Sequence, residues 1–437
     1  MKAHAIIIIS LLCIVLSCSK PSIPDGYIVV ALESNPSSLD PRLATDASSQ
    51  KIIRLMFNGL VKLDENMRPV PDLTTGWKKI DEVTYLFQLR KGVKFHNGKE
   101  VTASDVKFTF ESIFDPSIPS PHRGSYENIR FIEEKGRYSV IFKLKKPFSP
   151  FLTTMTMPII PEGYNGKALQ PPGTGPFRLV RWIQDEWVEL QANEEYFEGR
   201  PKTKGVIFKI IPDDTSRFLE LEKGNIHLIL NAIDPEALSI IQNRPSLFNV
   251  ITRPGTNYSY LGFNLRDPLL RNRKVREAIA RAIDRNAIIE NILKGLACPA
   301  TGILPPMHWA YEGDVEVYPY SPDKAKALLD EAGLFDPDGS GPKKRMKVVY
   351  KTSQNKLRRR IAEAIQAQLA EVGIDLEIRS YEWGTFYADI KSGNFQIYSL
   401  TWVGVTDPDI YYYIFHSSSI PPKGANRGGY INPEVDL

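Results

Sequence analysis

The chain has little excess charge of either sign and no apolar run long enough to cross a bilayer. Its 55 lysines and arginines are nearly balanced by 51 aspartates and glutamates. The two signs are mixed along the sequence, which argues against a basic surface for nucleic acid. A transmembrane helix needs about 20 consecutive apolar residues, and no segment provides them. With 42% hydrophobic residues, the composition is that of a folded globular protein with no nucleic-acid partner.

Sequence signatures of catalysis are also missing. The chain contains no H-E-x-x-H, G-x-S-x-G or G-x-x-x-x-G-K-[ST] pattern, the signatures of zinc proteases, serine hydrolases and phosphate-binding loops. Its six histidines are scattered, which argues against a metal site built from neighbouring positions. Asp336–Gly341 resembles half of a calcium loop, but Lys347 stands where a bidentate glutamate is needed. We expect a polar turn there, and no catalytic residue, cofactor or metal.

The N-terminus has the features of an export signal. An apolar, uncharged run over residues 5–16 is about 12 residues long, as in secretory signals. It ends in Leu16-Ser17-Cys18, which resembles the lipobox of bacterial lipoproteins. We predict a signal peptide over residues 1–17, a lipidated Cys18 and a linker over residues 18–26. An ordinary signal followed by an accidental cysteine is the alternative. The lipid would anchor an exported protein to a membrane, in the periplasm or on the cell surface.

Few cysteines remain for a disulfide. The sequence has three, of which Cys13 leaves with the predicted signal and Cys18 carries lipid. Cys298 is then alone, so stability has to come from the hydrophobic core. We expect Cys298 to be a small buried side chain rather than a reactive thiol.

Short strand patterns alternate with helix patterns after the linker, which predicts an α/β fold. Residues 85–89 and 206–210 are apolar on both faces, as in covered strands. Thr102 and Asp105 form a capping box at the start of a helix. Gly173-Thr174-Gly175 is expected to make a sharp turn.

The second half has the clearest helix signals. Apolar residues recur every fourth position from Lys356 to Val372, and Gly373 then predicts the end of that helix. Alternating apolar residues at 374–378 predict a half-buried strand. Another helix should start at Ser321-Pro322-Asp323 and end at Gly333.

Aromatic side chains are concentrated late in the chain. Such side chains line many ligand clefts, but they are equally common in cores, so their presence alone leaves both roles open. They are Tyr381, Trp383, Phe386, Tyr387, Tyr398, Trp402, Tyr411, Tyr412 and Tyr413.

Several collinear segments match one known family over nearly the whole mature chain. They are Asn35–Pro41, Phe57–Val61, Phe87–Gly98, Thr102–Val106, Gly173–Phe177, Gly262–Asn264, Val275–Ile279 and Trp402–Pro408. By these segments the chain resembles the family 5 solute-binding proteins, the oligopeptide and dipeptide receptors of ABC importers.

The resemblance implies a two-lobed α/β receptor with the type II periplasmic-binding-protein fold, which closes over its ligand by hinge bending. It implies lobe I at residues 27–58 and 172–258, an inserted subdomain at 59–171 and lobe II at 259–437. The implied partners are a peptide-like solute and the ABC permease subunits in the membrane, with the receptor a monomer. The alternatives are the same fold with an oligosaccharide, opine or metal chelate, a secreted hydrolase, and a sensory or adhesive lipoprotein.

At one position of the implied ligand site, the chain differs from the peptide receptors of the family. Peptide receptors place an aspartate three residues after the motif tryptophan, where it pairs with the ligand α-ammonium, but here that position is Val405. The next carboxylate is Asp407, for which capping of a turn is equally open. The arginine that dipeptide receptors use for the ligand carboxylate has no evident match near residues 382–384. The suggested residues are Trp402, Gly404, Asp407, Trp383, Glu33 and Tyr258.

The C-terminal segment Gly429–Leu437 resembles the start of a late helix, and related chains continue beyond it. We therefore expect the sequence to be truncated, with the last part of lobe I missing.

Overall fold

The computed structural model describes residues 23–166, 171–231, 233–339, 341–421 and 423–436. The predicted signal peptide and Cys18 lie outside these residues. Two compact units are present: unit 1 has the described residues of Met1–Lys62 and Val70–Asp234, and unit 2 has those of Leu63–Pro69 and Pro235–Leu437. The predicted lobe boundaries at 59, 172 and 259 remain predictions. No helix within the described ranges has both the length and the apolar character that a membrane crossing requires.

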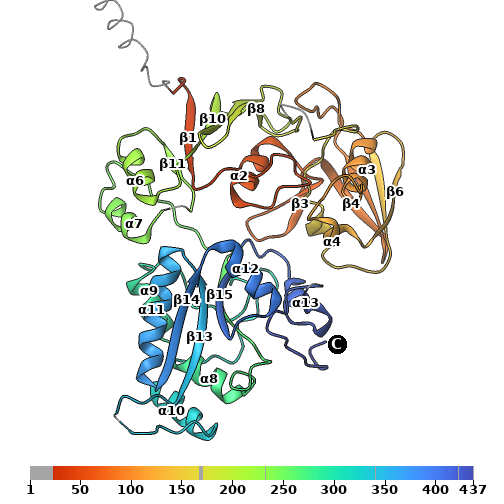
Figure 1. Cartoon of the computed structure of the whole chain (residues 1–437). Coiled ribbons are helices and arrows are strands. Elements are labelled where there is room, and N and C mark those ends of the chain that lie inside the picture. The colour runs from red at the N-terminus through yellow and green to blue at the C-terminus, as the bar shows by residue number, and fades with distance from the viewer. Residues whose placement is uncertain (1–22, 167–170, 232, 340, 422, 437) are drawn as a thin grey trace, which may run out of the picture. The chain divides into compact units, whose positions relative to one another are not determined.

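The first half of the chain supplies the elements of unit 1, many of which are labelled in Figure 1, although Leu63 of β2 and Pro69 of β3 belong to the stretch assigned to unit 2. The strands are β1 (Tyr27–Leu32), β2 (Val61–Leu63), β3 (Pro69–Pro71), β4 (Thr74–Asp81), β5 (Thr84–Leu89), β6 (Ile129–Glu134), β7 (Ser139–Leu144), β8 (Phe177–Ile183), β9 (Trp187–Ala192), β10 (Gly205–Ile210) and β11 (Leu228–Ile229). The helices are α2 (Ala47–Met56), α3 (Ala103–Ser112), α4 (Arg123–Tyr126), α5 (Phe151–Thr154) and α6 (Asp214–Glu222).

Unit 1 contains two large sheets with separate cores. One has the order β11-β1-β10-β9-β8, with β1 parallel to β10 and β11, and α2 buries Ile52 and Met56 with its strands. The other is the antiparallel sheet β4-β5-β7-β6, against which α3 buries Val106 and Phe110. Among the described residues, the buried side chains in the core of the second sheet come from residues 60–159, and those in the core of the first sheet come from residues before and after that stretch.

The predicted strands of unit 1 are present, but they differ in how they are covered. In β10, Phe208 belongs to one buried cluster and Ile207 packs against another, as expected of a covered strand. In β5, Phe87 and Leu89 are buried whereas Gln88 is exposed. The expectation of two covered faces is therefore wrong for β5, because it lies in an antiparallel sheet with one face open to solvent.

Gly173 and Gly175 lie where two backbone segments come into close contact. Neither glycine has a positive φ. A Cβ on Gly173 would lie 1.8 Å from the backbone oxygen of Met56, and one on Gly175 would lie 2.5 Å from the backbone oxygen of Leu55. The chain bends at Gly175, and glycine is needed because two backbones meet at the end of α2.

Unit 2 has helices on both faces of one sheet. The strands are β12 (Tyr258–Phe263), β13 (Met346–Ser353), β14 (Ile374–Tyr381) and β15 (Ile397–Trp402). The helices are α7 (Pro235–Gln242), α8 (Arg273–Ala282), α9 (Arg285–Asn291), α10 (Pro322–Glu331), α11 (Lys356–Glu371), α12 (Trp383–Ser392), α13 (Ile410–Phe415) and the 3₁₀ helix η1 (Ser417–Ser419).

The sheet of unit 2 has the order β12-β15-β13-β14, in which β13 runs parallel to β14 and β15 and only β12 is antiparallel. On one face, Ile365 of α11 packs with Ile397 of β15. On the other, Phe386 of α12 packs with Leu400 of β15. Figure 1 shows α11 alongside β14 and β13. The predicted α/β class is thus confirmed for unit 2.

The local signals for helix ends in the sequence are confirmed. α3 begins with the Thr102–Asp105 capping box. α10 has its predicted first-turn proline. Gly333 and Gly373, which follow α10 and α11, have φ values of 80° and 85°, the left-handed conformation that ends many helices.

Cys298 does not have the burial predicted for it. Its side chain is exposed, because the segment after α9 is irregular and lies at the surface of unit 2.

Candidate functional site

The parallel strands of unit 2 end at a common edge of the sheet, here called the carboxyl edge. Because β13, β14 and β15 run in the same direction, their last residues, Ser353, Tyr381 and Trp402, lie at this edge. β12 runs the opposite way and begins there, with Tyr258 directly opposite Trp402. Ligands of open α/β sheets bind outside the carboxyl ends of the strands. The predicted residues Tyr258 and Trp402 therefore lie where this fold usually binds ligands.

Tyr258 and Trp402 are only partly buried. Both pack against a small cluster that includes Ile303 and Leu304, which fixes one side of each ring. The Trp402 ring meets Tyr413 edge-on, with 6.2 Å between ring centroids. Burial raises the pKa of Tyr258, so its hydroxyl stays neutral at physiological pH. The rings can therefore form a rigid, uncharged wall.

The loop after β15 turns at Gly404, which has a φ of 68°. Its N–H donates to Asn257 Oδ1 at 3.1 Å, so the loop is held against the residue before β12. Asp407 Oδ1 accepts from the Asp409 backbone N–H at 2.9 Å, which is a turn-capping bond before α13. Gly404 and Asp407 thus shape the loop, and a ligand contact by either of them remains a prediction.

Val405, which the resemblance places where peptide receptors have an aspartate, points into the core. It is 5% exposed and belongs to the cluster with Ile303 and Leu304. Its backbone N–H donates to Thr256 O at 2.9 Å. A carboxylate at this position would lose its hydration without a counter-charge from this cluster. The loop is therefore built around an apolar side chain.

Trp383 begins α12, immediately after β14. Glu382 caps the helix by accepting hydrogen bonds from the backbone N–H groups of Gly384 and Thr385. Trp383 is 52% exposed and stacks on Tyr387 one helical turn later, with 5.5 Å between centroids and 7° between ring planes. An exposed, pre-ordered indole of this kind is a good surface for a ligand.

Arg427 joins the two predicted tryptophans, and sequence analysis missed it. Its guanidinium lies 5.0 Å from the centroid of the Trp402 ring and 5.6 Å from that of Tyr387. Its Nη1 donates to the Tyr260 hydroxyl at 3.0 Å and its Nη2 to the Tyr387 hydroxyl at 3.4 Å. Trp383, Tyr387, Arg427 and Trp402 thus form a continuous row, here called the aromatic–arginine row. Arg427 lies in a loop outside any periodic pattern, which left no local signal of its role.

A second cation at this edge was also missed. Arg358, in the first turn of α11, donates from Nη2 to Thr401 Oγ1 at 3.1 Å. Burial lowers the pKa of Arg358, although a guanidinium remains charged at physiological pH.

Glu33 lies in unit 1, immediately after β1. Its carboxylate pairs with Lys51 Nζ of α2 at 3.2 Å. Of the predicted ligand residues, Glu33 is in unit 1 and the other five are in unit 2. The charge of Glu33 is thus already neutralised by Lys51.

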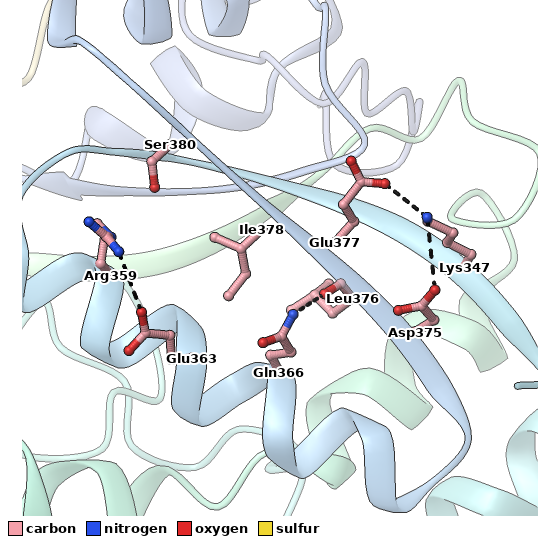
Figure 2. Close-up of a pocket in the computed structure, with 9 residues that line it drawn as sticks. All are labelled: Lys347, Arg359, Glu363, Gln366, Asp375, Leu376, Glu377, Ile378 and Ser380. Atoms are coloured by element: carbon pink, nitrogen blue, oxygen red, sulfur yellow. Dashed lines mark hydrogen bonds and ion pairs between the residues drawn. The ribbon is translucent and has the colours of Figure 1, made fainter. Parts of the chain in front are cut away.

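An open hollow of about 670 Å³ lies elsewhere on unit 2, between α11 and β14 (Figure 2). Its charges pair with one another: Lys347 Nζ lies 3.0 Å from a Glu377 oxygen, and Arg359 lies 3.8 Å from Glu363. None of the predicted ligand residues lines it. It is therefore a polar surface groove rather than the predicted site. Among the described residues, no group of His, Cys, Asp and Glu side chains could hold a metal ion.

Comparison with known proteins identifies the family. Residues 68–422 match the model of the bacterial extracellular solute-binding proteins, family 5. The oligopeptide-binding protein AppA of Bacillus subtilis is 33% identical over 96% of this chain and 81% of its own length.

Solved structures agree with this match. NikZ from Campylobacter jejuni in complex with Ni(L-His) has a TM-score of 0.80 at 30% identity, covering 95% of this chain and 85% of that one. AppA from Bacillus subtilis in complex with a nonapeptide has a TM-score of 0.77 at 32% identity, covering 94% and 85%. The predicted periplasmic-binding-protein fold is confirmed, and the chain belongs to the family 5 bacterial extracellular solute-binding proteins.

Proposed function

We propose that this chain is the extracytoplasmic receptor of an ABC importer, which captures a peptide-like solute and delivers it to the permease. The observation that supports this most strongly is the aromatic–arginine row at the carboxyl edge of unit 2. Aromatic faces accept apolar side chains and flat peptide groups, and a guanidinium accepts a carboxylate. A peptide carries all of these groups.

The relatives favour a peptide and keep one alternative open. AppA is named as an oligopeptide-binding protein, and its solved structure holds a nonapeptide. NikZ is described in complex with Ni(L-His), which favours a metal chelate as the second candidate solute. A secreted hydrolase is disfavoured, because the family is one of binding proteins and the sequence has no catalytic signature. We therefore propose a receptor without enzymatic activity.

The proposed contacts follow from the positions of the side chains. Trp402, Trp383 and Tyr258 are assigned as walls for the solute, Gly404 and Asp407 as the loop that holds Trp402 in place, and Glu33 as a contact from unit 1. Because Val405 replaces the aspartate that would meet an α-ammonium, we expect a free N-terminus to contribute little to binding.

Export and partners complete the proposal. We propose that the chain acts as a monomer outside the cytoplasm, held on the membrane by lipid on Cys18 so that it stays near the permease subunits. Binding energy would stabilise the closed form that a permease recognises.

The proposal is tested by thermal unfolding of the purified full chain in detergent with a panel of peptides, oligosaccharides and Ni(L-His). A ligand that binds only the folded state stabilises it by about 2.7 kcal/mol at a hundredfold excess over its dissociation constant. A raised melting temperature with peptides supports the proposal. A rise only with Ni(L-His) or sugars reassigns the solute, and no rise with any of them contradicts the receptor function.

A further inference from the structure

The buried arginines among the described residues differ in whether a carboxylate pairs with them. Four arginines are less than 9% exposed: Arg42, Arg217, Arg281 and Arg427. Arg42 pairs with Asp40 at 2.7 Å and Arg281 with Glu277 at 2.8 Å. Arg217 pairs with Asp214. Burial of a guanidinium is thus accompanied by a carboxylate in each of these three.

Arg427 has no such partner. Its neighbours are the hydroxyls of Tyr260, Tyr387 and Tyr398 and the rings of Tyr387 and Trp402, and no described carboxylate lies within ion-pair distance of it. Burial, reinforced by the neighbouring Tyr398, raises the pKa of Tyr260, so the Tyr260 hydroxyl stays neutral. The phenols supply dipoles to the guanidinium and no negative charge.

Within the described residues, no charge of opposite sign offsets the burial of this cation. Loss of hydration costs a buried ion several kcal/mol, whereas a desolvated cation–π contact returns about 2 kcal/mol. The hydrogen bonds to Tyr260 and Tyr387 use one donor each of Nη1 and Nη2. Because a guanidinium has five donors in a planar fork, donors remain that match the two oxygens of a carboxylate.

We propose that Arg427 anchors a carboxylate of the solute, so that the missing counter-charge arrives with the ligand. This inference rests on the proposed receptor function and specifies the solute class as one that carries a carboxylate. Trp402 and Tyr387 hold the guanidinium in place, and Tyr260 fixes its rotation through Nη1. The geometry is set before binding, which lowers the entropy cost of forming the ion pair.

The test compares peptides that differ only at the C-terminus. Dissociation constants are measured by calorimetry for tripeptides and tetrapeptides as free acids and as C-terminal amides. The wild-type chain should bind the acids at least tenfold more tightly, since a tenfold change corresponds to about 1.4 kcal/mol and the loss of one partner from a buried ion pair exceeds that value. Arg427→Gln should bind acids and amides equally, and Arg427→Lys should retain part of the preference.

Arg281→Gln is the matched control. Arg281 is also buried in unit 2 and lies over an aromatic ring, that of Tyr318, at 5.3 Å. Its loss should lower the melting temperature and leave the preference for acids intact, which separates loss of stability from loss of the anchor. An acid preference that survives in Arg427→Gln, or that is absent from the wild-type chain, overturns the inference.

A second measurement tests the carboxylate anchor even if no peptide binds and the proposed peptide-receptor function fails. The side-chain Nε signal of Arg427 is followed by ¹⁵N NMR during titration with N-acetylglycine and with its amide, and is assigned by its absence from Arg427→Lys. A shift with the acid alone supports the carboxylate anchor for another solute. Equal responses to both compounds, or no response, contradict it.

Discussion

Tyr258 stands directly opposite Trp402 across the β12–β15 ladder, and the guanidinium of Arg427 lies 5.0 Å from the centroid of the Trp402 ring. Trp402 therefore supports the cation, in addition to its proposed role as a wall for the solute. We expect Trp402→Ala to weaken binding of the most stabilising peptide at least tenfold, because tryptophan is among the side chains that contribute most to binding energies. Trp402→Phe keeps a ring beside Arg427 and should lose less. Isothermal titration calorimetry measures both.

Phe335→Ala provides the control for Trp402→Ala. Phe335 is 68% exposed in unit 2 and lies outside the carboxyl edge, in the loop after α10. Its removal should leave the dissociation constant unchanged. Equal losses in the two variants would argue against a wall role for Trp402.

Gly173→Ala should destabilise unit 1 strongly. The new Cβ would lie 1.8 Å from the Met56 oxygen, so the backbone at the end of α2 has to move. We expect a loss of about 3 kcal/mol, at the upper end of typical overpacking costs. Gly76→Ala is the control: it lies in β4 of the same unit, and a Cβ there meets nothing within 4 Å. Urea unfolding should show little change for Gly76→Ala, and similar losses in both variants would contradict the contact.

Asp72 should make unit 1 less stable as the pH rises. Burial raises the pKa of Asp72 to about 6, against opposing effects of Lys62 and the Asn58 side chain. The folded state therefore holds this proton more tightly than the unfolded state, whose carboxyl has a pKa of about 3.9. The contribution is favourable below about pH 4 and is lost between about pH 4 and 6, amounting to about 3 kcal/mol.

The measurement is the free energy of unfolding between pH 4 and pH 7. In Asp72→Asn, the fall in stability over this range should be smaller than in the wild-type chain. Asp81→Asn is the control: a hydrogen bond from the Val83 backbone lowers the pKa of the exposed Asp81, so its contribution changes mainly below about pH 4 and the fall between pH 4 and pH 7 should stay close to that of the wild-type chain. An unchanged pH dependence in Asp72→Asn would rule out a raised pKa for that group.

The fold could be predicted from sequence where the signals are local. The Thr102–Asp105 capping box and the glycines after α10 and α11 act within a few residues of the helix ends they set, and each was placed correctly. The role of Gly173 could not be predicted, since its contact with Met56 joins positions far apart in sequence.

The candidate site was predicted only in part for the same reason. Trp402 and Trp383 stand in or near recognisable segments, whereas Arg427 acquires its role only when α12, β15 and the loop at residue 427 converge. Neither hydrophobic periodicity nor a spacing rule reports on such a convergence. The burial of Cys298 was misjudged because apolar neighbours in sequence do not ensure neighbours in space.

Cys18→Ser tests the proposed anchor. Without the thiol no acyl chain can be attached, and we expect the protein to move from the membrane fraction to the soluble fraction. Cys13→Ser, inside the predicted signal, should leave the protein on the membrane. Fractionation of cells followed by immunoblotting distinguishes the two, and equal membrane retention of both variants would contradict a lipid on Cys18.

Val405→Asp tests whether this loop can hold an aspartate at the position where the resemblance places the aspartate of peptide receptors. Because Val405 is buried with Ile303 and Leu304, the carboxylate would replace an apolar side chain and lose its hydration. We expect a loss of about 3 kcal/mol or more in the free energy of unfolding, and no gain in affinity for peptides with a free α-ammonium. Val403→Asp lies in the same loop but is 71% exposed, so it should change stability by less than about 0.5 kcal/mol. If Val405→Asp instead folds normally and binds free N-termini more tightly, the side chain turns outward, and the ammonium pocket of the peptide receptors can be restored by one substitution.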